Sequence, residues 1–320
     1  MKGKKWSSGI AAFVIVLLAS GPCSWSADFE TLRKALEAEI EASGAEVSLA
    51  LKDLQTGENL FIKEKDMVHA ASTMKVAVLI EVFKQAEDGR FRLDDRVVIR
   101  NEFHSLVDGS PFSLNKADDS DPDIYDRVGT AMSIRELADR MITVSSNMAT
   151  NILVELVRPE NVMSTLELLG IRRMRVLRGV EDGKAFERGL NNQTDAYDLM
   201  LAMEAIATGR AGSGPSCREM VEILEKQRFR GGIPAGLPAE VPAGNKSGSI
   251  TGMEHDAAIV FPPGRRPYVL AVLTRGVKSS EEGEKLIARL SRLIYDRITS
   301  AGTGAGKRAL GREESRLSDR

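Results

Sequence analysis

The sequence contains little cysteine and little histidine. Among its 320 residues are two cysteines and three widely scattered histidines. Neither an H-x-H nor an H-E-x-x-H spacing occurs, so we expect no metal site and no cofactor. If the N-terminal segment described below is removed, Cys217 is the only cysteine left, which excludes an intrachain disulfide. An exported protein of this kind has to rely on its packed core.

The sequence also lacks an excess of charge of either sign. Its formal net charge is −2, with 28% charged and 42% hydrophobic residues. This balance gives no electrostatic reason to expect nucleic acid or an acidic membrane surface as a partner. The length and composition are typical of one sizeable globular unit with an ample core.

Long apolar runs are absent except near the start of the chain. Residues 1–5 are basic, residues 9–20 are apolar, and Ser24 and Ser26 offer small side chains for cleavage before Ala27. This layout is typical of a secretory signal peptide, residues 1–26, and predicts a secreted or periplasmic protein without stable membrane insertion. The alternative is a retained anchor. Lipid attachment at Cys23 is disfavoured because Pro22 precedes it.

Strand patterns occur at both ends of the remaining chain, and helical patterns lie between them. We predict strands at 46–54, 60–62, 241–249, 256–261 and 268–274, and helices at 29–42, 72–86, 133–144, 147–157, 161–169, 194–208, 215–227 and 279–298. The predicted fold class is α+β, with an antiparallel sheet flanked by helices and an all-helical subdomain. The α/β part comprises residues 27–70 and 195–299, the helical part residues 71–194. Residues 300–320 are predicted to be a disordered tail.

Two long segments without periodicity, 101–130 and 171–192, are predicted to be loops. Long ordered loops inside compact domains are usually functional. The first contains the acidic run 118–123 (DDSDPD). This run lacks the Gly and the terminal Glu of an EF-hand loop, so we interpret it as solvated rather than calcium-binding.

A serine and a lysine three residues apart, Ser72 and Lys75, open a predicted helix that is apolar nearly all round. This spacing places both side chains on one face of the helix, and a helix apolar on all sides is buried. A lysine with a lowered pKa can take the proton that makes a serine nucleophilic. The pair alone is better explained if Ser72 is an ordinary helix N-cap. The interpretation therefore depends on the rest of the chain.

Two further motifs follow in the chain. Ser145-Ser146-Asn147 stands at the junction of two predicted helices, and Lys246-Ser247-Gly248 on a predicted strand. The motifs S-x-x-K, S-D-N and K-T-G occur together in class A β-lactamases and penicillin-binding proteins. Over residues 29–298 the chain therefore resembles the penicillin-recognising serine hydrolases, in particular the class A β-lactamase-like branch. A G-x-S-x-G elbow is absent, which disfavours a Ser-His-Asp hydrolase, and nothing indicates a glutaminase.

The resemblance implies catalytic roles for three of these residues. Ser72 would attack the carbonyl carbon of a lactam or a peptide. Lys75 would help to deprotonate it, and Ser145 would pass a proton to the leaving nitrogen. The backbone N–H groups of Ser72 and Ser249 would form the oxyanion hole, where each donor contributes roughly 10²–10³ in rate.

The other motif residues are implied to bind substrate. Asn147 would form a hydrogen bond with a substrate amide. Lys246 and Ser247 would hold the carboxylate that penicillins share with peptide C-termini. Gly248 has no side chain, so substrate could lie directly against the strand.

The chain departs from the family pattern at three positions. Ser146 replaces the motif's Asp, which removes a carboxylate, whereas Ser247 replaces Thr and keeps the hydroxyl. In the E-x-x-x-N loop of class A enzymes, Glu181 corresponds to the water-activating Glu, but Ala185 stands where Asn holds the water. A general base contributes roughly 10²–10⁴-fold, so losing its partner predicts fast acylation and slow deacylation. The alternative is that Glu181 is a surface carboxylate.

Three functions remain open on this basis. The first is an exported serine β-lactamase that forms an acyl-enzyme on Ser72. The second is a peptidoglycan-directed or other serine hydrolase of the same fold with weak deacylation of lactams, favoured by Ala185 and by the long loop 101–130. The third, a non-catalytic lactam or muropeptide binder, is disfavoured because Ser72 and Lys75 are both present. In each case we expect a monomer with a small-molecule partner.

Overall fold

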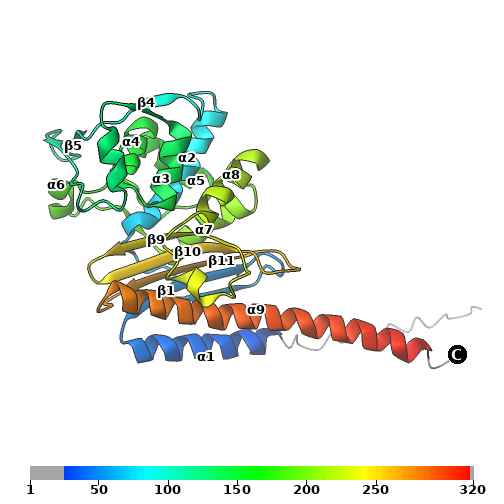
Figure 1. Ribbon diagram of the computed structural model, residues 1–320. Helices are drawn as coiled ribbons and strands as arrows, with labels where there is room; N and C mark the ends of the chain where they lie inside the picture. Colours follow the sequence, from blue (N-terminus) through cyan, green and yellow to red (C-terminus); the bar gives the residue numbers. More distant parts are fainter. Residues whose placement is uncertain (1–24, 318–320) are drawn as a thin grey trace, which may run out of the picture.

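A five-stranded antiparallel sheet separates two helical layers (Figure 1). The computed structural model describes residues 25–317, with side chains from residue 29 to residue 300. The strand order in the sheet is β2-β1-β11-β10-β9, and all neighbours pair antiparallel. These strands are β1 (Glu46–Asp53), β2 (Asn59–Ile62), β9 (Ala243–Ile250), β10 (Met253–Val260) and β11 (Tyr268–Arg275). The predicted α+β class is confirmed.

The two helical layers differ in size. Below the sheet in Figure 1 lie α1 (Trp25–Ser43) and α9 (Ser280–Leu317), and above it lie the other helices. These are α2 (Lys75–Glu87), α3 (Ile134–Thr143), α4 (Asn147–Val157), α5 (Pro159–Leu168), α6 (Gly183–Glu187), α7 (Ala196–Ala207) and α8 (Gly214–Glu225). The boundaries predicted between the α/β and helical parts, at 70/71 and 194/195, remain predictions.

Short elements complete the two helical layers, and the one at Ile233–Gly236 packs against α9 below the sheet. They are the 3₁₀ turns η1 (Ala71–Met74), η2 (Pro122–Arg127) and η3 (Ile233–Gly236), and the strands β3 (Val68–His69), β4 (Arg96–Val98), β5 (Phe103–His104), β6 (Pro111–Phe112), β7 (Ala131–Ser133) and β8 (Gln193–Thr194). Of these, β5, β6 and η2 lie in the segment predicted as the loop 101–130. Likewise α6 lies within the predicted loop 171–192. Such elements are too short to produce a recognisable period in sequence.

The alternation of β11 divides its side chains between two hydrophobic cores. Successive residues of a strand point to opposite faces of the sheet. One set packs with α1 and α9, and the other with the helices of the upper layer. The first set is Tyr268, Leu270 and Val272, and the second is Val269, Ala271 and Leu273. The sheet is therefore covered on both faces.

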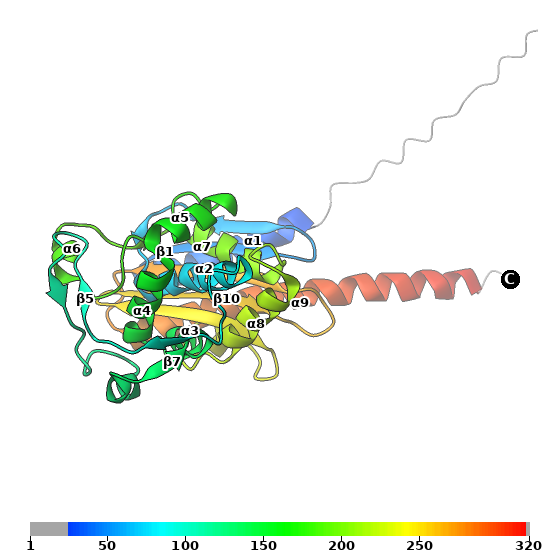
Figure 2. The same cartoon turned by 90° about the horizontal axis from the view of Figure 1, so that it is seen from above.

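Helix α2 runs through the middle of the upper layer, as the sequence predicts. Ten of its residues are buried, among them Lys75 and Glu81. The turn after it is closed by Gly89, whose φ of +73° is the left-handed conformation that a glycine adopts at little cost. Figure 2, seen from above, shows α2 over the centre of the sheet. Its first residue is thereby held rigidly beside the sheet.

The ends of the chain differ from expectation in one respect. Helix α9 continues to Leu317 and projects beyond the sheet (Figures 1 and 2), where the sequence predicted a disordered tail from residue 300. No proline follows Pro267 to end the helix. Most of the predicted signal peptide lies outside the described residues, and α1 begins at Trp25, before the predicted cleavage site. Within residues 25–317, no helix is both long and apolar enough to cross a membrane.

Candidate active site

A cavity of about 500 Å³ lies where the upper layer meets the edge strand β9. Four segments line it, and each contributes a residue singled out from the sequence: Ser72 from η1, Asn147 from α4, Glu181 from the loop before α6, and Ser249 from β9. These residues are far apart in sequence. The fold therefore brings the predicted site residues to one place, which we call the cleft.

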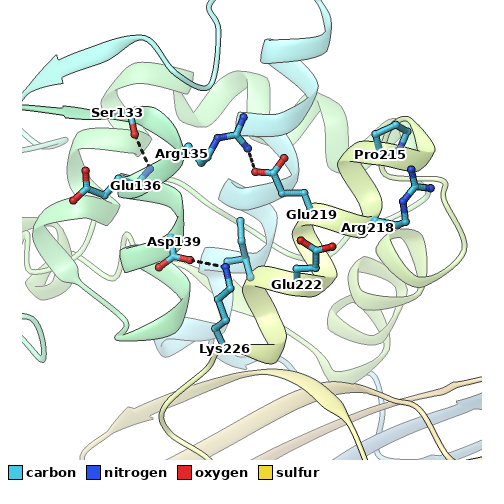
Figure 3. Close-up of a pocket in the computed structure, with 10 residues that line it drawn as sticks. Ser133, Arg135, Glu136, Asp139, Pro215, Arg218, Glu219, Glu222 and Lys226 are labelled. Atoms are coloured by element: carbon cyan, nitrogen blue, oxygen red, sulfur yellow. Dashed lines mark hydrogen bonds and ion pairs between the residues drawn. The ribbon is translucent and has the colours of Figure 1, made fainter.

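A second hollow of about 500 Å³ lies between α3 and α8 (Figure 3). Its walls carry charged side chains that pair with each other, including Arg135 with Glu219 and Lys226 with Asp139. The Ser133 hydroxyl that faces it accepts a hydrogen bond of 3.1 Å from the Glu136 N–H and caps α3. That bond confirms the predicted helix start. The hollow holds no nucleophile with a neighbouring base, so the chemistry belongs to the cleft.

The turn that carries Ser72 is a 3₁₀ turn, not the first turn of the α-helix. The sequence predicted an α-helix from residue 72, but α2 begins at Lys75. Ala71, just before Ser72, has a φ of +46°, a left-handed conformation that costs a non-glycine residue about 1–3 kcal/mol. The N-cap position of the turn is Ala70, so the interpretation of Ser72 as a cap is wrong. Strain of this kind persists only where surrounding contacts enforce it.

Two histidines enforce the conformation of this turn. His69 Nδ1 accepts a 3.0 Å hydrogen bond from the Ala71 N–H. His255 Nδ1 accepts the Thr274 N–H at 3.1 Å, which leaves its Nε2–H to donate to the His69 carbonyl at 3.0 Å. Burial lowers the pKa of His255 to about 4, so it is neutral at physiological pH. The nucleophile turn is thus tied to β10 by backbone and ring contacts.

Lys75 is completely buried, and its ammonium group has three polar partners. Nζ donates to the Ser145 carbonyl at 2.7 Å, to Ser145 Oγ at 3.1 Å and to Asn147 Oδ1 at 2.9 Å. Burial lowers the pKa of Lys75 well below its usual value, and the charge of Lys246 lowers it further. The charges of Asp119 and Glu181 oppose this shift. A buried lysine with a lowered pKa can act as a proton acceptor.

Ser145 lies between two lysines. Lys246 Nζ, also completely buried, donates to Ser145 Oγ at 3.1 Å and to the Ser247 carbonyl at 2.7 Å. Ser145 has a φ of +57°, a strained conformation that points its hydroxyl at both ammonium groups. Burial lowers the pKa of Lys246 to about 7, against the charges of Asp256 and Glu254. Either lysine can therefore exchange a proton with this hydroxyl.

Gly248 is required by contact with the nucleophile turn. A Cβ at this position would lie 2.9 Å from the Ser72 nitrogen and 3.0 Å from the Thr73 nitrogen. These are backbone atoms that cannot move aside. From the sequence we expected that the missing side chain of Gly248 leaves room for substrate. The structure shows that the turn of Ser72 itself occupies this space. Next to it, Ser247 is half-buried, and Ser249 is exposed, with its hydroxyl 3.1 Å from that of Ser280.

Glu181 lines the cleft, and contacts with α4 hold it there. Its Oε1 accepts a 2.6 Å hydrogen bond from Asn147 Nδ2, and its φ is +62°. One turn along α4, Asn151 forms two hydrogen bonds with the backbone of Val180, at 2.6 Å and 3.0 Å. Although Glu181 as a residue is exposed, partial desolvation and the charges of Asp119 and Asp118 raise its pKa, whereas the Asn147 bond lowers it. Its place beside Asn147 argues against an isolated surface carboxylate.

Ala185 is completely buried in α6 and offers only a methyl group. Its N–H donates to Asp182 Oδ1 at 3.1 Å, which caps this short helix. The other oxygen of Asp182 accepts the Leu106 N–H at 2.8 Å, and its Oδ1 also accepts Ser105 Oγ at 2.9 Å. The loop of Glu181 is thus fastened to the segment 101–112. No side-chain amide stands at residue 185 to hold a water for Glu181.

Sequence reasoning missed the residues that support this site. It interpreted the acidic run 118–123 as solvated, but Asp119 and Asp121 are buried, because each carboxylate has partners in the helical part. It gave no role to His69 or to Asn151. The one available signal was the position of Asn151, four residues after Asn147 and therefore on the same face of a predicted helix.

A strained turn carries Ser72 just before the buried Lys75. Lys75 contacts a second serine, Ser145, which also contacts a second lysine, Lys246, on the edge strand β9. This arrangement defines a serine hydrolase of the penicillin-recognising class. The chain belongs to the Beta-lactamase enzyme family, whose family model matches residues 31–298. It is 30% identical over 271 residues to the β-lactamase AST-1 of Nocardia asteroides, covering 82% of each chain.

Solved structures agree with this assignment. The crystal structure of a β-lactamase from Sphaerobacter thermophilus superimposes with a TM-score of 0.70 at 27% identity, covering 83% of this chain and 96% of that chain. An ancestral class A β-lactamase gives a TM-score of 0.70 at 25% identity, covering 83% and 99%. The resemblance inferred from the motifs is confirmed: the protein is a class A β-lactamase-like serine hydrolase.

Proposed function

We propose that this protein hydrolyses the amide bond of β-lactams through an acyl-enzyme on Ser72. The observation that carries the proposal is the convergence of Lys75 and Lys246 on the Ser145 hydroxyl beside the Ser72 turn. The relationship to β-lactamases of other organisms supports the lactam as substrate.

Acylation would begin with proton transfer from Ser72. Lys75, with its lowered pKa, is suited to accept this proton directly or through Ser145, while Ser72 Oγ bonds to the lactam carbonyl carbon. The N–H groups of Ser72 and Ser249 are proposed to hold the oxyanion. When the carbon–nitrogen bond breaks, Ser145 Oγ gives a proton to the leaving nitrogen and is reprotonated by a lysine.

Substrate would be oriented from both sides of the cleft. Lys246 in its charged form and the Ser247 hydroxyl are proposed to bind the carboxylate of the substrate. Asn147 is proposed to bind an amide of its side chain. Gly248 then serves as the point where β9 lies close to the nucleophile turn.

Deacylation is proposed to depend on Glu181 as the base that activates water. The raised pKa of Glu181 makes its carboxylate a stronger base than that of an ordinary glutamate. Because Ala185 offers no polar group to position the water, we expect this second step to be slow compared with acylation.

Time-resolved intact-protein mass spectrometry with a penicillin tests this proposal, alongside turnover of a chromogenic cephalosporin. The wild type should gain the mass of one penicillin and lose it slowly. Ser72→Ala should gain none, and Glu181→Gln should keep the adduct longer than the wild type. Turnover by Ser72→Ala equal to that of the wild type would refute the mechanism.

A second function is favoured by Ala185 and by the long segment 101–130, which contacts the loop of Glu181 through Asp182. In this alternative the chain is a hydrolase of peptidoglycan-like peptides that releases lactams poorly. It predicts a persistent adduct with little cephalosporin turnover, together with cleavage of a muropeptide. A non-catalytic binder would form no adduct on Ser72 at all.

We further propose that the protein is exported, by cleavage of residues 1–26, to act in the periplasm or outside the cell, where lactam hydrolysis would give antibiotic resistance. The basic and apolar pattern at the start of the chain supports export. N-terminal sequencing of the secreted protein should find Ala27 first, and light scattering should give the mass of a monomer.

A further inference from the structure

The carboxylate of Asp119 lies against the first turn of α4. Its two oxygens each accept the Asn147 N–H at 3.0 Å, and Oδ2 also accepts the Met148 N–H at 2.9 Å. The side chain is 6% exposed, and the Tyr125 hydroxyl donates to it at 3.1 Å. The first N–H groups of a helix lack partners within the helix and form its positive end. Asp119 satisfies two of them with a negative charge.

Through Asn147 this contact reaches both sides of the reaction centre. The backbone N–H of Asn147 is held by Asp119, its Oδ1 accepts Lys75 Nζ at 2.9 Å, and its Nδ2 donates to Glu181 at 2.6 Å. The position of the Asn147 backbone therefore sets where the lysine and the carboxylate lie. A shift of α4 by a fraction of an ångström would lengthen both bonds.

Asp119 also supplies charge to the buried groups. The three described partners of Lys75 Nζ are a carbonyl, a hydroxyl and an amide oxygen, none of which is ionised. Charges face Lys75 from three elements: Lys246 on β9, Glu181 in the loop before α6, and Asp119. Asp119 and Glu181 favour the charged lysine, and Asp119 and Asp118 both oppose ionisation of Glu181.

Ser146 does not provide this charge. It is the N-cap of α4, and among the described residues its hydroxyl accepts only the Ala149 N–H, at 3.3 Å. The family motif has an aspartate at this position. Ser120, the neighbour of Asp119, donates to the Val144 carbonyl at 2.7 Å, so the segment 119–121 is fastened to the same turn.

We propose that Asp119, from the long segment 101–130, replaces in space the carboxylate that the motif has lost at Ser146. Asp119 is in this view a positioning residue: it holds Asn147, and through it Lys75, for acylation of Ser72. The inference rests on the acyl-enzyme mechanism proposed above. It also gives the segment 101–130 a specific purpose.

The first test compares Asp119→Asn with Asp121→Asn by the rate constant of penicillin acylation across pH. Asp121 lies in the same segment and is equally buried, but it pairs with Arg140 at 2.9 Å. Asp119→Asn should slow acylation about 10- to 100-fold, the effect of losing hydrogen bonds to a charged group. Its acid limb should move to lower pH, whether Lys75 or Glu181 is the base, because removing a negative charge lowers both pKa values. Asp121→Asn should leave the acid limb unchanged.

The second test returns the carboxylate to the motif position. Ser146→Asp added to Asp119→Asn should raise the acylation rate at least tenfold above that of Asp119→Asn alone, because Asp is a favoured N-cap residue. Circular dichroism and thermal unfolding establish that each variant is folded. A folded double variant that recovers nothing would overturn the replacement of one carboxylate by the other.

The outcomes also separate this inference from the proposed function. A wild type that forms no adduct on Ser72 refutes the mechanism, and the inference with it. A wild type that acylates normally, with Asp119→Asn showing the same rate and pH profile, overturns the inference alone. Equal losses in Asp119→Asn and Asp121→Asn would reduce Asp119 to an ordinary structural residue.

Discussion

Lys75 on α2 and Lys246 on β9 each place their Nζ 3.1 Å from the same hydroxyl, that of Ser145. Both lysines are completely buried, and burial lowers the pKa of each. Two ammonium groups so close also repel each other, which favours the state in which one is neutral. The arrangement suits a site that moves a proton between groups without solvent.

The pKa of about 7 for Lys246 predicts a basic limb in the pH profile. Lys246 is charged below this pH and neutral above it, so binding of a carboxylate substrate to the free enzyme should weaken as pH rises. We expect kcat/KM to fall about tenfold per pH unit above about 7. Lys246→Arg should lower the overall rate but remove this limb, because arginine stays charged. A basic limb that persists in Lys246→Arg would assign it to another group.

Ala185→Asn should speed deacylation. It would restore an amide that can hold a water against Glu181, and a well-placed general base contributes roughly 10²–10⁴-fold. We expect the lifetime of the penicillin adduct, followed by mass spectrometry, to shorten at least tenfold. Because residue 185 is completely buried, imperfect hydrogen bonding of the new amide should lower the stability by about 1–3 kcal/mol. Glu187→Asn, in the exposed last turn of α6, is the control, and an equal effect in both would contradict the prediction.

His69→Asn should make the protein less sensitive to acid. His69 Nδ1 can accept the Ala71 N–H only while the ring is neutral. Burial and the charge of Arg178, the charged group that faces the ring, lower the pKa of His69, and the Phe186 ring packs on it at 6.3 Å. An asparagine can accept the same bond at any pH.

The sign of this effect follows from proton linkage. As pH falls, His69 takes up a proton in the unfolded chain at the ordinary histidine pKa of about 6.5, but in the folded protein only at a lower pH. The free energy of unfolding therefore falls as pH falls below about 6.5. His255, with a pKa of about 4, contributes to the same loss and remains in the variant. Thermal unfolding between pH 7 and pH 5 should therefore show a smaller decrease for His69→Asn than for the wild type. Identical slopes would refute the role of His69.

The motifs were predictable from sequence because each is local. The separation of three positions between Ser72 and Lys75 puts both on one face of a turn or helix, and Lys246 and Gly248 share one face of a strand. The nearly continuous apolar run of β11 agrees with the covering of the sheet on both faces that the structure shows. These features gave the α+β class and the family resemblance. They did not give the 3₁₀ form of the Ser72 turn, which depends on His69.

What the tertiary structure alone decided is which groups support the motifs. The carboxylate of Asp119 reaches Asn147 across 28 residues of sequence, and Lys75 reaches Ser145 across 70. A pattern within the chain records the period of helices and strands, but not which distant loop packs on a helix end. The sequence by itself thus determined the chemistry available to this protein. The fold determined its charge balance, because burial and the distances between buried groups set their pKa values.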